Sequence, residues 1–286
     1  MITSLTLGEN GRLGNQLFQY AALRSLGLKN DYKVKIPSPT QKTWHSQECL
    51  LDNFHIPVDH LTDADLDSLL YTYREPNYMK YDSEFFNLPD NHNIWGYFQS
   101  ILYFKEFEDQ IKYELSPTDA LVEEATEYIG NMREDTKKKI VSIHLRRGDN
   151  TNQTNPSRLL NDMYCEGGFY FSYLKEALKI FSNEEVAYLV FSGGSRDNNN
   201  NEEDLQWCRK HLGIEALYSE GGSTMQDFSR IMVCDYNILS PVSSFGWWAA
   251  YLNSEKKRVV APLHYHPDLP KYTHRKGFYP SNFILV

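Results

Sequence analysis

The sequence predicts an α/β fold built from parallel βα units, because short apolar runs rich in β-branched residues alternate with segments of helical period. The length of 286 residues exceeds what one small core requires and fits two domains of roughly 100–200 residues each. Hydrophobic residues make up 41% and charged residues 23%, which excludes the disordered and fibrous classes.

The individual elements follow from apolar patterning. Short apolar runs indicate strands, and apolar residues that recur every three or four positions indicate one face of a helix. The predicted strands are residues 2–7, 140–145, 186–191, 236–239 and 258–261, and the predicted helices lie within residues 17–26, 170–181 and 225–232.

A polar segment suggests where the two domains divide. Residues 131–139 contain few apolar side chains and precede the clearest strand of the chain. We therefore expect an N-terminal domain over residues 1–139 and a C-terminal domain over residues 140–286, which holds most of the βα units. A second polar run, residues 198–204, is interpreted as a solvated loop insertion.

Charge and cysteine content limit the classes of partner. The chain has 29 basic and 38 acidic residues, a net charge of −9, which argues against a nucleic-acid binder with a broad basic face. The cysteines form no C-x-x-C pair, so we expect reduced thiols rather than a zinc ribbon or a disulfide framework. They are Cys49, Cys165, Cys208 and Cys234.

Neither a membrane span nor a metal site is predicted. No stretch approaches the roughly 18 uninterrupted apolar residues of a membrane helix, and no secretory signal follows Met1, so the expected location is cytoplasmic. His264, His266 and His274 lie in a proline-rich segment with Asp268 as the one nearby carboxylate, which is a poor set of metal ligands.

A glycine-rich turn follows the first predicted strand. Residues 8–16 read GENGRLGNQ and lead into an apolar helix, so backbone N–H groups can approach a ligand at the helix N-terminus. A tight βα turn in which Asn15 caps the helix explains the same residues. The spacing differs from the G-x-G-x-x-G of dinucleotide-binding folds.

A basic turn follows the strand at residues 140–145. It brings His144, Arg146, Arg147 and Asp149 to the carboxyl end of the strand, where open α/β sheets bind their ligands. Adjacent guanidiniums repel each other, so an anion or several carboxylates must compensate them. A planar guanidinium suits a pyrophosphate, and a carboxylate can hold one arginine in place. The alternative is an Arg–Asp salt bridge that closes the turn, with the second arginine in solvent.

A third segment combines hydroxyls with an apolar helix. Ser243 and Ser244 follow the strand at residues 236–239 and begin the run SSFGWWAAYL, so their hydroxyls and nearby N–H groups can cradle a phosphate. The aromatic residues of this run are interpreted as core.

Four segments together resemble a known family. Residues 11–21 (GRLGNQLFQYA), 95–100 (WGYFQS), 144–149 (HLRRGD) and 243–252 (SSFGWWAAYL) occur in the order found in the α-1,2-fucosyltransferases of glycosyltransferase family 11. The resemblance implies a GT-B-like architecture, in which two Rossmann-like domains face a cleft. It also implies GDP-fucose as donor, bound by the C-terminal domain, and a β-galactoside acceptor on the side of the N-terminal domain.

The resemblance also implies roles for single residues. His144 would lie near the guanosine and Arg146 on the β-phosphate, with Arg147 and Asp149 in support. Ser243 and Ser244 would lie near the diphosphate, whereas Arg12, Gly14 and Asn15 would approach the donor sugar. Many members continue one strand with Phe-Ser-Asp-Asp, whereas this chain has Phe191-Ser192-Gly193-Gly194 and then a polar insertion, in which Asp197 is a possible substitute.

The reaction implied by the resemblance inverts the anomeric centre in a single displacement with GDP as the leaving group. Charge grows on the β-phosphate as the bond breaks, so Arg146 would stabilise the transition state in place of a metal. Candidates for the base are Asp149, His144 and Glu9. Two rival interpretations remain open: a fucosyltransferase of another linkage, and a non-catalytic protein that binds a nucleotide sugar or a glycan.

Overall fold

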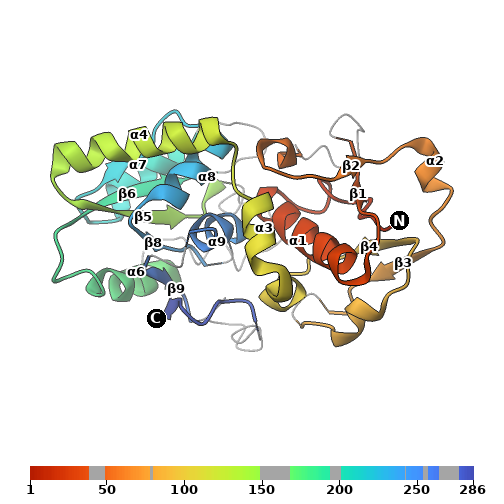
Figure 1. Ribbon diagram of the computed structural model, residues 1–286. Coiled ribbons are helices and arrows are strands. Elements are labelled where there is room, and N and C mark those ends of the chain that lie inside the picture. Colours follow the sequence, from red (N-terminus) through yellow and green to blue (C-terminus); the bar gives the residue numbers. More distant parts are fainter. Residues whose placement is uncertain are drawn as a thin grey trace. The chain divides into compact units, whose positions relative to one another are not determined.

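The structure is a computed structural model (Figure 1) that describes residues 1–38, 49–77, 80–148, 168–193, 201–241, 243–253, 257–263 and 277–286. The chain divides into two compact units. The first comprises the described residues of Met1–Thr118 and His274–Pro280, and the second those of Asp119–Thr273 and Ser281–Val286.

The first unit is built on short parallel strands. β1 (Lys35–Ile36) pairs with β2 (Asp59–His60), and β3 (Tyr71–Arg74) pairs with β4 (His92–Trp95). Between the two pairs, Ile2 bridges to the residue before β1 and Thr3 bridges to β4. The helices are α1 (Leu13–Asn30), η1 (Leu51–Asn53), α2 (Asp63–Leu66), η2 (Ser83–Asn87), η3 (Ile101–Tyr103), η4 (Lys105–Phe107) and α3 (Glu108–Glu114).

The predicted strand at residues 2–7 is therefore too long. Its pairing stops at Thr3, and the backbone then turns, since Leu7 N–H donates to Ser4 O at 3.1 Å and Glu9 N–H donates to Thr6 O at 2.9 Å. A run of β-branched and apolar residues predicts burial as well as strand, and here burial accounts for Leu7, which is 3% exposed.

The second unit contains one six-stranded parallel sheet in the order β10-β9-β8-β5-β6-β7. The predictions for four of its strands are confirmed to within one or two residues. The strands are β5 (Lys139–Leu145), β6 (Val186–Ser192), β7 (Leu217–Tyr218), β8 (Tyr236–Ile238), β9 (Val259–Ala261) and β10 (Ile284–Leu285).

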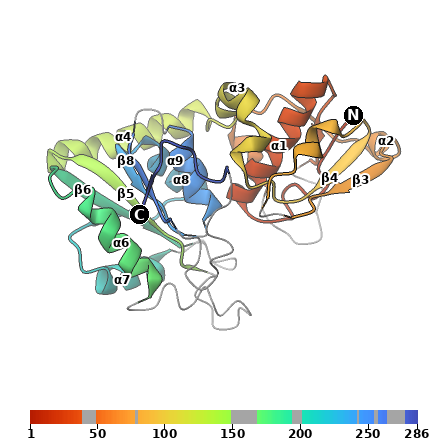
Figure 2. The ribbon, with the colours of Figure 1, turned by 90° about the horizontal axis from the view of Figure 1, so that it is seen from below.

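Helices cover both faces of this sheet, as a parallel sheet requires. Alternate residues of β5, namely Val141, Ile143 and Leu145, pack with α6 (Phe169–Lys179) and α7 (Glu202–His211). The other face carries α4 (Asp119–Thr136), α8 (Thr224–Val233) and α9 (Ser244–Tyr251) (Figure 2). Because β5 pairs with both β6 and β8, it lies inside the sheet. Its carboxyl end therefore lies between the carboxyl ends of β6, which is followed by α7, and β8, which is followed by α9.

The division between the units lies at Thr118 and Asp119, about 20 residues before the predicted boundary. The polar residues 131–136 belong to α4, whose buried residues are Ala125 and Ile129. A surface helix needs only a narrow apolar stripe, so its charged end resembles a linker in sequence.

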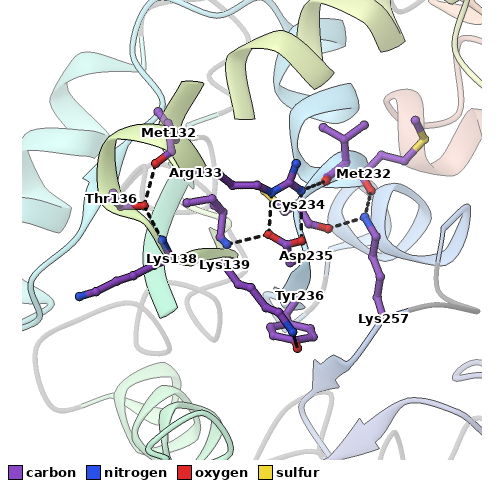
Figure 3. Close-up of polar contacts among 12 residues, drawn as sticks. Met132, Arg133, Thr136, Lys138, Lys139, Met232, Cys234, Asp235, Tyr236 and Lys257 are labelled. Atoms are coloured by element: carbon purple, nitrogen blue, oxygen red, sulfur yellow. Dashed lines mark hydrogen bonds and ion pairs between the residues drawn. The ribbon is translucent and has the colours of Figure 1, made fainter. Parts of the chain in front are cut away.

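An ion pair fastens the end of α4 to the sheet (Figure 3). The guanidinium of Arg133 donates to both carboxylate oxygens of Asp235, with Nε–Oδ2 at 2.9 Å and Nη2–Oδ1 at 3.2 Å. The same Oδ2 accepts the backbone N–H of Ile140 at 2.8 Å. One carboxylate therefore joins α4, β5 and the start of β8.

We expect Asp235→Ala to lower the free energy of unfolding by about 1–3 kcal/mol, because it leaves a buried backbone N–H and an arginine without their acceptor. Asp135→Ala is the matched control, since Asp135 lies exposed on α4, and it should change stability by less than about 0.5 kcal/mol. Chemical denaturation of both variants is the measurement. Equal stability of the two would contradict the role given to Asp235.

Candidate functional site

His144 lies at the carboxyl end of β5 and is 5% exposed. Its ring faces Phe245 at the start of α9, with ring centroids 5.6 Å apart. Its Nδ1 is buried and has no hydrogen-bond partner within the described part of the chain. Burial, together with the nearby charge of Arg146, lowers the pKa of His144 to about 3, so the imidazole is neutral at physiological pH.

Gly246 explains how α9 comes so close to this ring. A Cβ at position 246 would lie 2.5 Å from His144 Nδ1, which is far inside van der Waals contact. Only a residue without a side chain lets the first turn of α9 pack against the imidazole.

Arg146 begins the turn after β5. Its backbone N–H donates to Ser240 Oγ at 2.9 Å, and its guanidinium Nη1 donates to Gly193 O at 3.3 Å and to Arg147 O at 3.4 Å. Ser240 follows β8 and Gly193 follows β6, so the arginine turn contacts the loops after both neighbouring strands. This is the edge of the sheet at which the sequence predicts a ligand.

Arg147 is bound by α7. Its Nε donates to Asp204 Oδ1 at 3.0 Å, while the backbone N–H of Gly148 donates to Asp204 Oδ2, also at 3.0 Å. The guanidinium carbon lies 3.7 Å from the ring centroid of Trp207. Neither Asp204 nor Trp207 was identified from the sequence as a partner of Arg147.

The prediction of a loop at residues 198–204 is wrong at its end. Glu202, Glu203 and Asp204 form the first turn of α7, where acidic residues favour the helix dipole. A signal for this was present, because three acidic residues precede an apolar pattern in the way that helices begin. Residues 194–200, with Asp197, lie outside the described residues.

Ser243 is the N-cap of α9 and is 6% exposed; its Oγ accepts the N–H of Gly246 at 3.5 Å. Ser244 is the first helical residue and is half-buried. The N–H groups of this first turn and the Arg146 turn lie at the same edge of the sheet, because Ser240 links their two loops. The prediction that the aromatics of this helix are core is confirmed for Trp248, which is fully buried.

The glycine-rich turn of the first unit leads into α1, with Arg12 as its N-cap residue. Asn15 therefore lies inside the first turn and does not cap the helix, contrary to one of the two interpretations of this segment. Gly11 has φ of +103°, and a Cβ there would lie 2.1 Å from Asn15 Nδ2. Gly14 is buried, whereas Arg12 and Asn15 are half-buried.

The WGYFQS segment holds the side chain of Asn15. Gln99 Nε2 donates to Asn15 Oδ1 at 2.8 Å. Glu75, which the sequence analysis missed, accepts the N–H groups of Tyr97 and Phe98 at 2.7 and 3.1 Å and so fixes the turn before Gln99. Phe98 has φ of +51° in this turn.

Several predicted residues lie outside the described residues. These are Asp149, Cys165, His264, His266, Asp268 and His274. Cys49, Cys208 and Cys234 are free thiols. Within the described ranges, no group of three or more His, Cys, Asp or Glu side chains is placed to hold a metal ion, and no helix is long and apolar enough to cross a membrane.

The model of the family "Glycosyl transferase family 11" matches residues 1–282. The chain belongs to glycosyl transferase family 11. This confirms the resemblance inferred from the four sequence segments.

The family 11 chain is similar to curated relatives at low identity. It is 26% identical over 259 residues to the galactoside 2-alpha-L-fucosyltransferase SEC1 of Bos taurus, covering 86% of this chain and 64% of the relative. It is 27% identical over 264 residues to the galactoside alpha-(1,2)-fucosyltransferase 1 of Homo sapiens, covering 86% and 65%. The chain thus spans just under two thirds of the length of these relatives.

Solved structures share the fold of this family 11 chain. POFUT1 in complex with GDP aligns with a TM-score of 0.50 at 13% identity, over 91% of this chain and 97% of that one. FUT1 of Arabidopsis thaliana in complex with GDP also aligns with a TM-score of 0.50 at 13% identity, over 93% and 72%. The prediction of a GT-B-like α/β fold with parallel sheets is confirmed.

Buried His144 should make the stability of this family 11 protein depend on pH. An unfolded histidine takes up a proton near pH 6.5, whereas folded His144 takes one up only near pH 3. Stability contributed by the neutral ring is therefore complete above pH 6.5 and decreases as the pH falls from 6.5 towards 3. In urea titrations at pH 7, 5 and 4, His144→Gln should lose less stability than the wild type over this range; an identical pH dependence would contradict a buried neutral imidazole.

Gly246→Ala and Gly130→Ala should have effects of opposite sign. The first places a methyl group against His144 and should destabilise by about 1–3 kcal/mol. The second lies in α4 with no atom within 4 Å of the new Cβ, and should stabilise by about 0.5–1 kcal/mol, since alanine favours helix. Thermal unfolding compares the two; a neutral Gly246→Ala would show that α9 does not need the close approach.

Proposed function

We propose that this chain is an inverting fucosyltransferase that moves L-fucose from GDP-β-L-fucose to the 2-hydroxyl of a β-galactoside and forms an α-1,2 linkage. The observation that carries the proposal is the 2.9 Å hydrogen bond between Arg146 N–H and Ser240 Oγ, which brings the arginine turn and the start of α9 to one edge of the sheet. An arginine beside a helix N-terminus is an arrangement that suits a diphosphate. Family 11 membership, and relatives named galactoside alpha-(1,2)-fucosyltransferase, support the choice of sugar, linkage and acceptor.

The reaction replaces one glycosidic bond by another. The bond between fucose C1 and the β-phosphate oxygen breaks, its electron pair leaves with GDP, and the acceptor oxygen bonds to C1 while its proton passes to a base. Negative charge on the β-phosphate is larger in the transition state than in the bound donor. Arg146 and the N–H groups at the start of α9 therefore lower the barrier by binding that charge.

His144 binds the donor in its neutral form. A neutral ring can accept or donate a hydrogen bond to the nucleoside without adding a third positive charge beside Arg146 and Arg147. A group with a pKa of about 3 is also a weak base at neutral pH, which makes His144 the poorest of the three base candidates. Asp149 and Glu9 remain, with Asp149 supporting the donor as the resemblance implies.

The two units divide the substrates in this proposal. The second unit, with His144, Arg146, Arg147, Ser243 and Ser244, binds GDP. The first unit, with Arg12, Gly14 and Asn15, acts on the sugar and on the acceptor side. The hydrogen bond from Gln99 to Asn15 supports this, because it fixes the amide of Asn15 in one orientation.

Incubation with GDP-fucose and lactose tests the activity. Release of GDP together with a product whose NMR spectrum shows fucose α-linked to O2 of galactose is the expected result. A product of another linkage would favour the rival fucosyltransferase. Donor binding without GDP release would favour the non-catalytic binder.

Arg146→Ala and Asn15→Ala should separate donor binding from transfer. Arg146→Ala should weaken GDP binding and reduce turnover about 10²–10³-fold, because a charge-assisted contact to the leaving group is lost. Arg146→Lys should also be poor, since an ammonium lacks the planar fork. Asn15→Ala should leave GDP affinity within a few fold while turnover falls severely. Calorimetric titration with GDP, beside turnover assays, compares them; Arg209→Ala, an exposed arginine on α7, is the control.

Activity should persist in EDTA, because the guanidinium of Arg146 and the N–H groups at the start of α9 supply positive charge at the diphosphate. The measurement is the initial rate of GDP release with and without the chelator. A complete loss that magnesium restores would mean that a cation carries this charge instead.

A further inference from the structure

The turn that carries Arg146 is held at both of its ends by other elements. On the N-terminal side of the turn, the backbone N–H of Arg146 donates to Ser240 in the β8–α9 loop. After it, Arg147 and Gly148 are fixed by Asp204 from α7. The backbone at Arg146 and at the two residues after it is therefore fixed by hydrogen bonds to residues distant in sequence.

We propose that Asp204 and Trp207 are positioning residues that clamp Arg147 and Gly148 and thereby hold the guanidinium of Arg146 where the donor diphosphate binds. This inference rests on the proposed function. Asp204 and Trp207 are three residues apart on α7 and so share one face of the helix. Together they bind the side chain of Arg147 by charge and by stacking.

The carboxylate of Asp204 acts on two groups at once. One oxygen accepts from the side chain of Arg147 and the other from the backbone of Gly148, both at 3.0 Å. A single contact would leave the turn free to rotate, whereas two contacts from one rigid group fix its orientation. The side chains of Arg147 and Asp204 are only 11% and 15% exposed, so solvent screens this pair less than a surface pair.

Trp207 is itself held in place. Its ring stacks on His211 with centroids 4.5 Å apart, and Phe171 of α6 lies 5.9 Å away. A fixed indole offers the guanidinium of Arg147 a flat surface at 3.7 Å, and tryptophan is the strongest cation–π partner among the side chains. Arg147 is thereby directed towards α7, and a loss of this contact would let the two adjacent guanidiniums compete for the same anion.

The experiment measures how much of the GDP affinity depends on the β-phosphate. Calorimetry with GDP, GMP and inorganic pyrophosphate is applied to the wild type and to Asp204→Asn, Trp207→Leu and Trp207→Phe. Asp204→Asn should weaken GDP and pyrophosphate about 10-fold and leave GMP nearly unchanged, because the β-phosphate contact of Arg146 is the one that loosens. Trp207→Leu should act in the same direction, and Trp207→Phe, which keeps an aromatic face, should largely restore affinity.

The control is Glu203→Gln, which makes the same change of charge on the neighbouring exposed residue of α7 and should leave all three affinities unaltered. Circular dichroism melting of each variant shows whether it is folded. Misfolding would lower GMP binding as well, whereas a misplaced Arg146 guanidinium would lower only the binding of GDP and pyrophosphate. In turnover assays Asp204→Asn and Trp207→Leu should lower kcat and raise the KM for the donor. A smaller fraction of active protein would lower the apparent kcat and leave KM unchanged.

The outcomes separate this inference from the proposed function. If the wild type binds GDP well and Asp204→Asn has the same preference for GDP over GMP, the clamp is overturned and the proposed donor stands. If the wild type binds pyrophosphate but not GDP, and Asp204→Asn weakens pyrophosphate, the clamp stands and the proposed donor is overturned. If the wild type binds neither, both are overturned.

Discussion

Two adjacent guanidiniums at the end of a buried strand impose the constraint that organises the second unit. Like charges repel strongly where solvent screening is weak, so two neighbouring arginines at one edge of a sheet need compensating partners. The structure separates their tasks. Arg147 is paired with Asp204 and stacked on Trp207, and Arg146 extends towards the carbonyl of Gly193. The start of α7 therefore supplies the negative charge that compensates Arg147 in the turn after β5.

The same strand sends different chemistry to its two faces. Alternation places Leu145 against α6 and α7, whereas His144 points towards α9, where Gly246 leaves room for the ring. Burial keeps the imidazole neutral, and this matters for its neighbours because a third positive charge would add to the repulsion between the arginines. An uncharged histidine and an arginine paired with Asp204 limit the accumulation of positive charge beside Arg146.

Local sequence identified candidate site residues but not the residues that contact them. The runs that became β5, β6, β8 and β9 are short and rich in apolar and β-branched residues, a pattern typical of a buried strand. The residues from His144 to Arg147 were found because they follow such a strand. Asp204, Trp207, Glu75 and the contact of Gln99 with Asn15 were missed, since each depends on a neighbour in space. The division at Thr118 also depends on neighbours in space: α4 packs against α8, and its Arg133 pairs with Asp235, about 100 residues away.

Asp204 lies on α7, in a part of the chain that is distant in sequence from Arg147. β5 and β6 are paired along seven residues, so their carboxyl ends lie side by side. Extending a loop costs little, because closure entropy grows only with the logarithm of its length. The place of Asp204 is set instead by the packing of α7, whose Leu205 and Cys208 are fully buried in the core beneath. Asp204 therefore faces Arg147 from a packed helix, although a polar insertion separates it in sequence from β6. Many family members carry two aspartates directly after the corresponding strand.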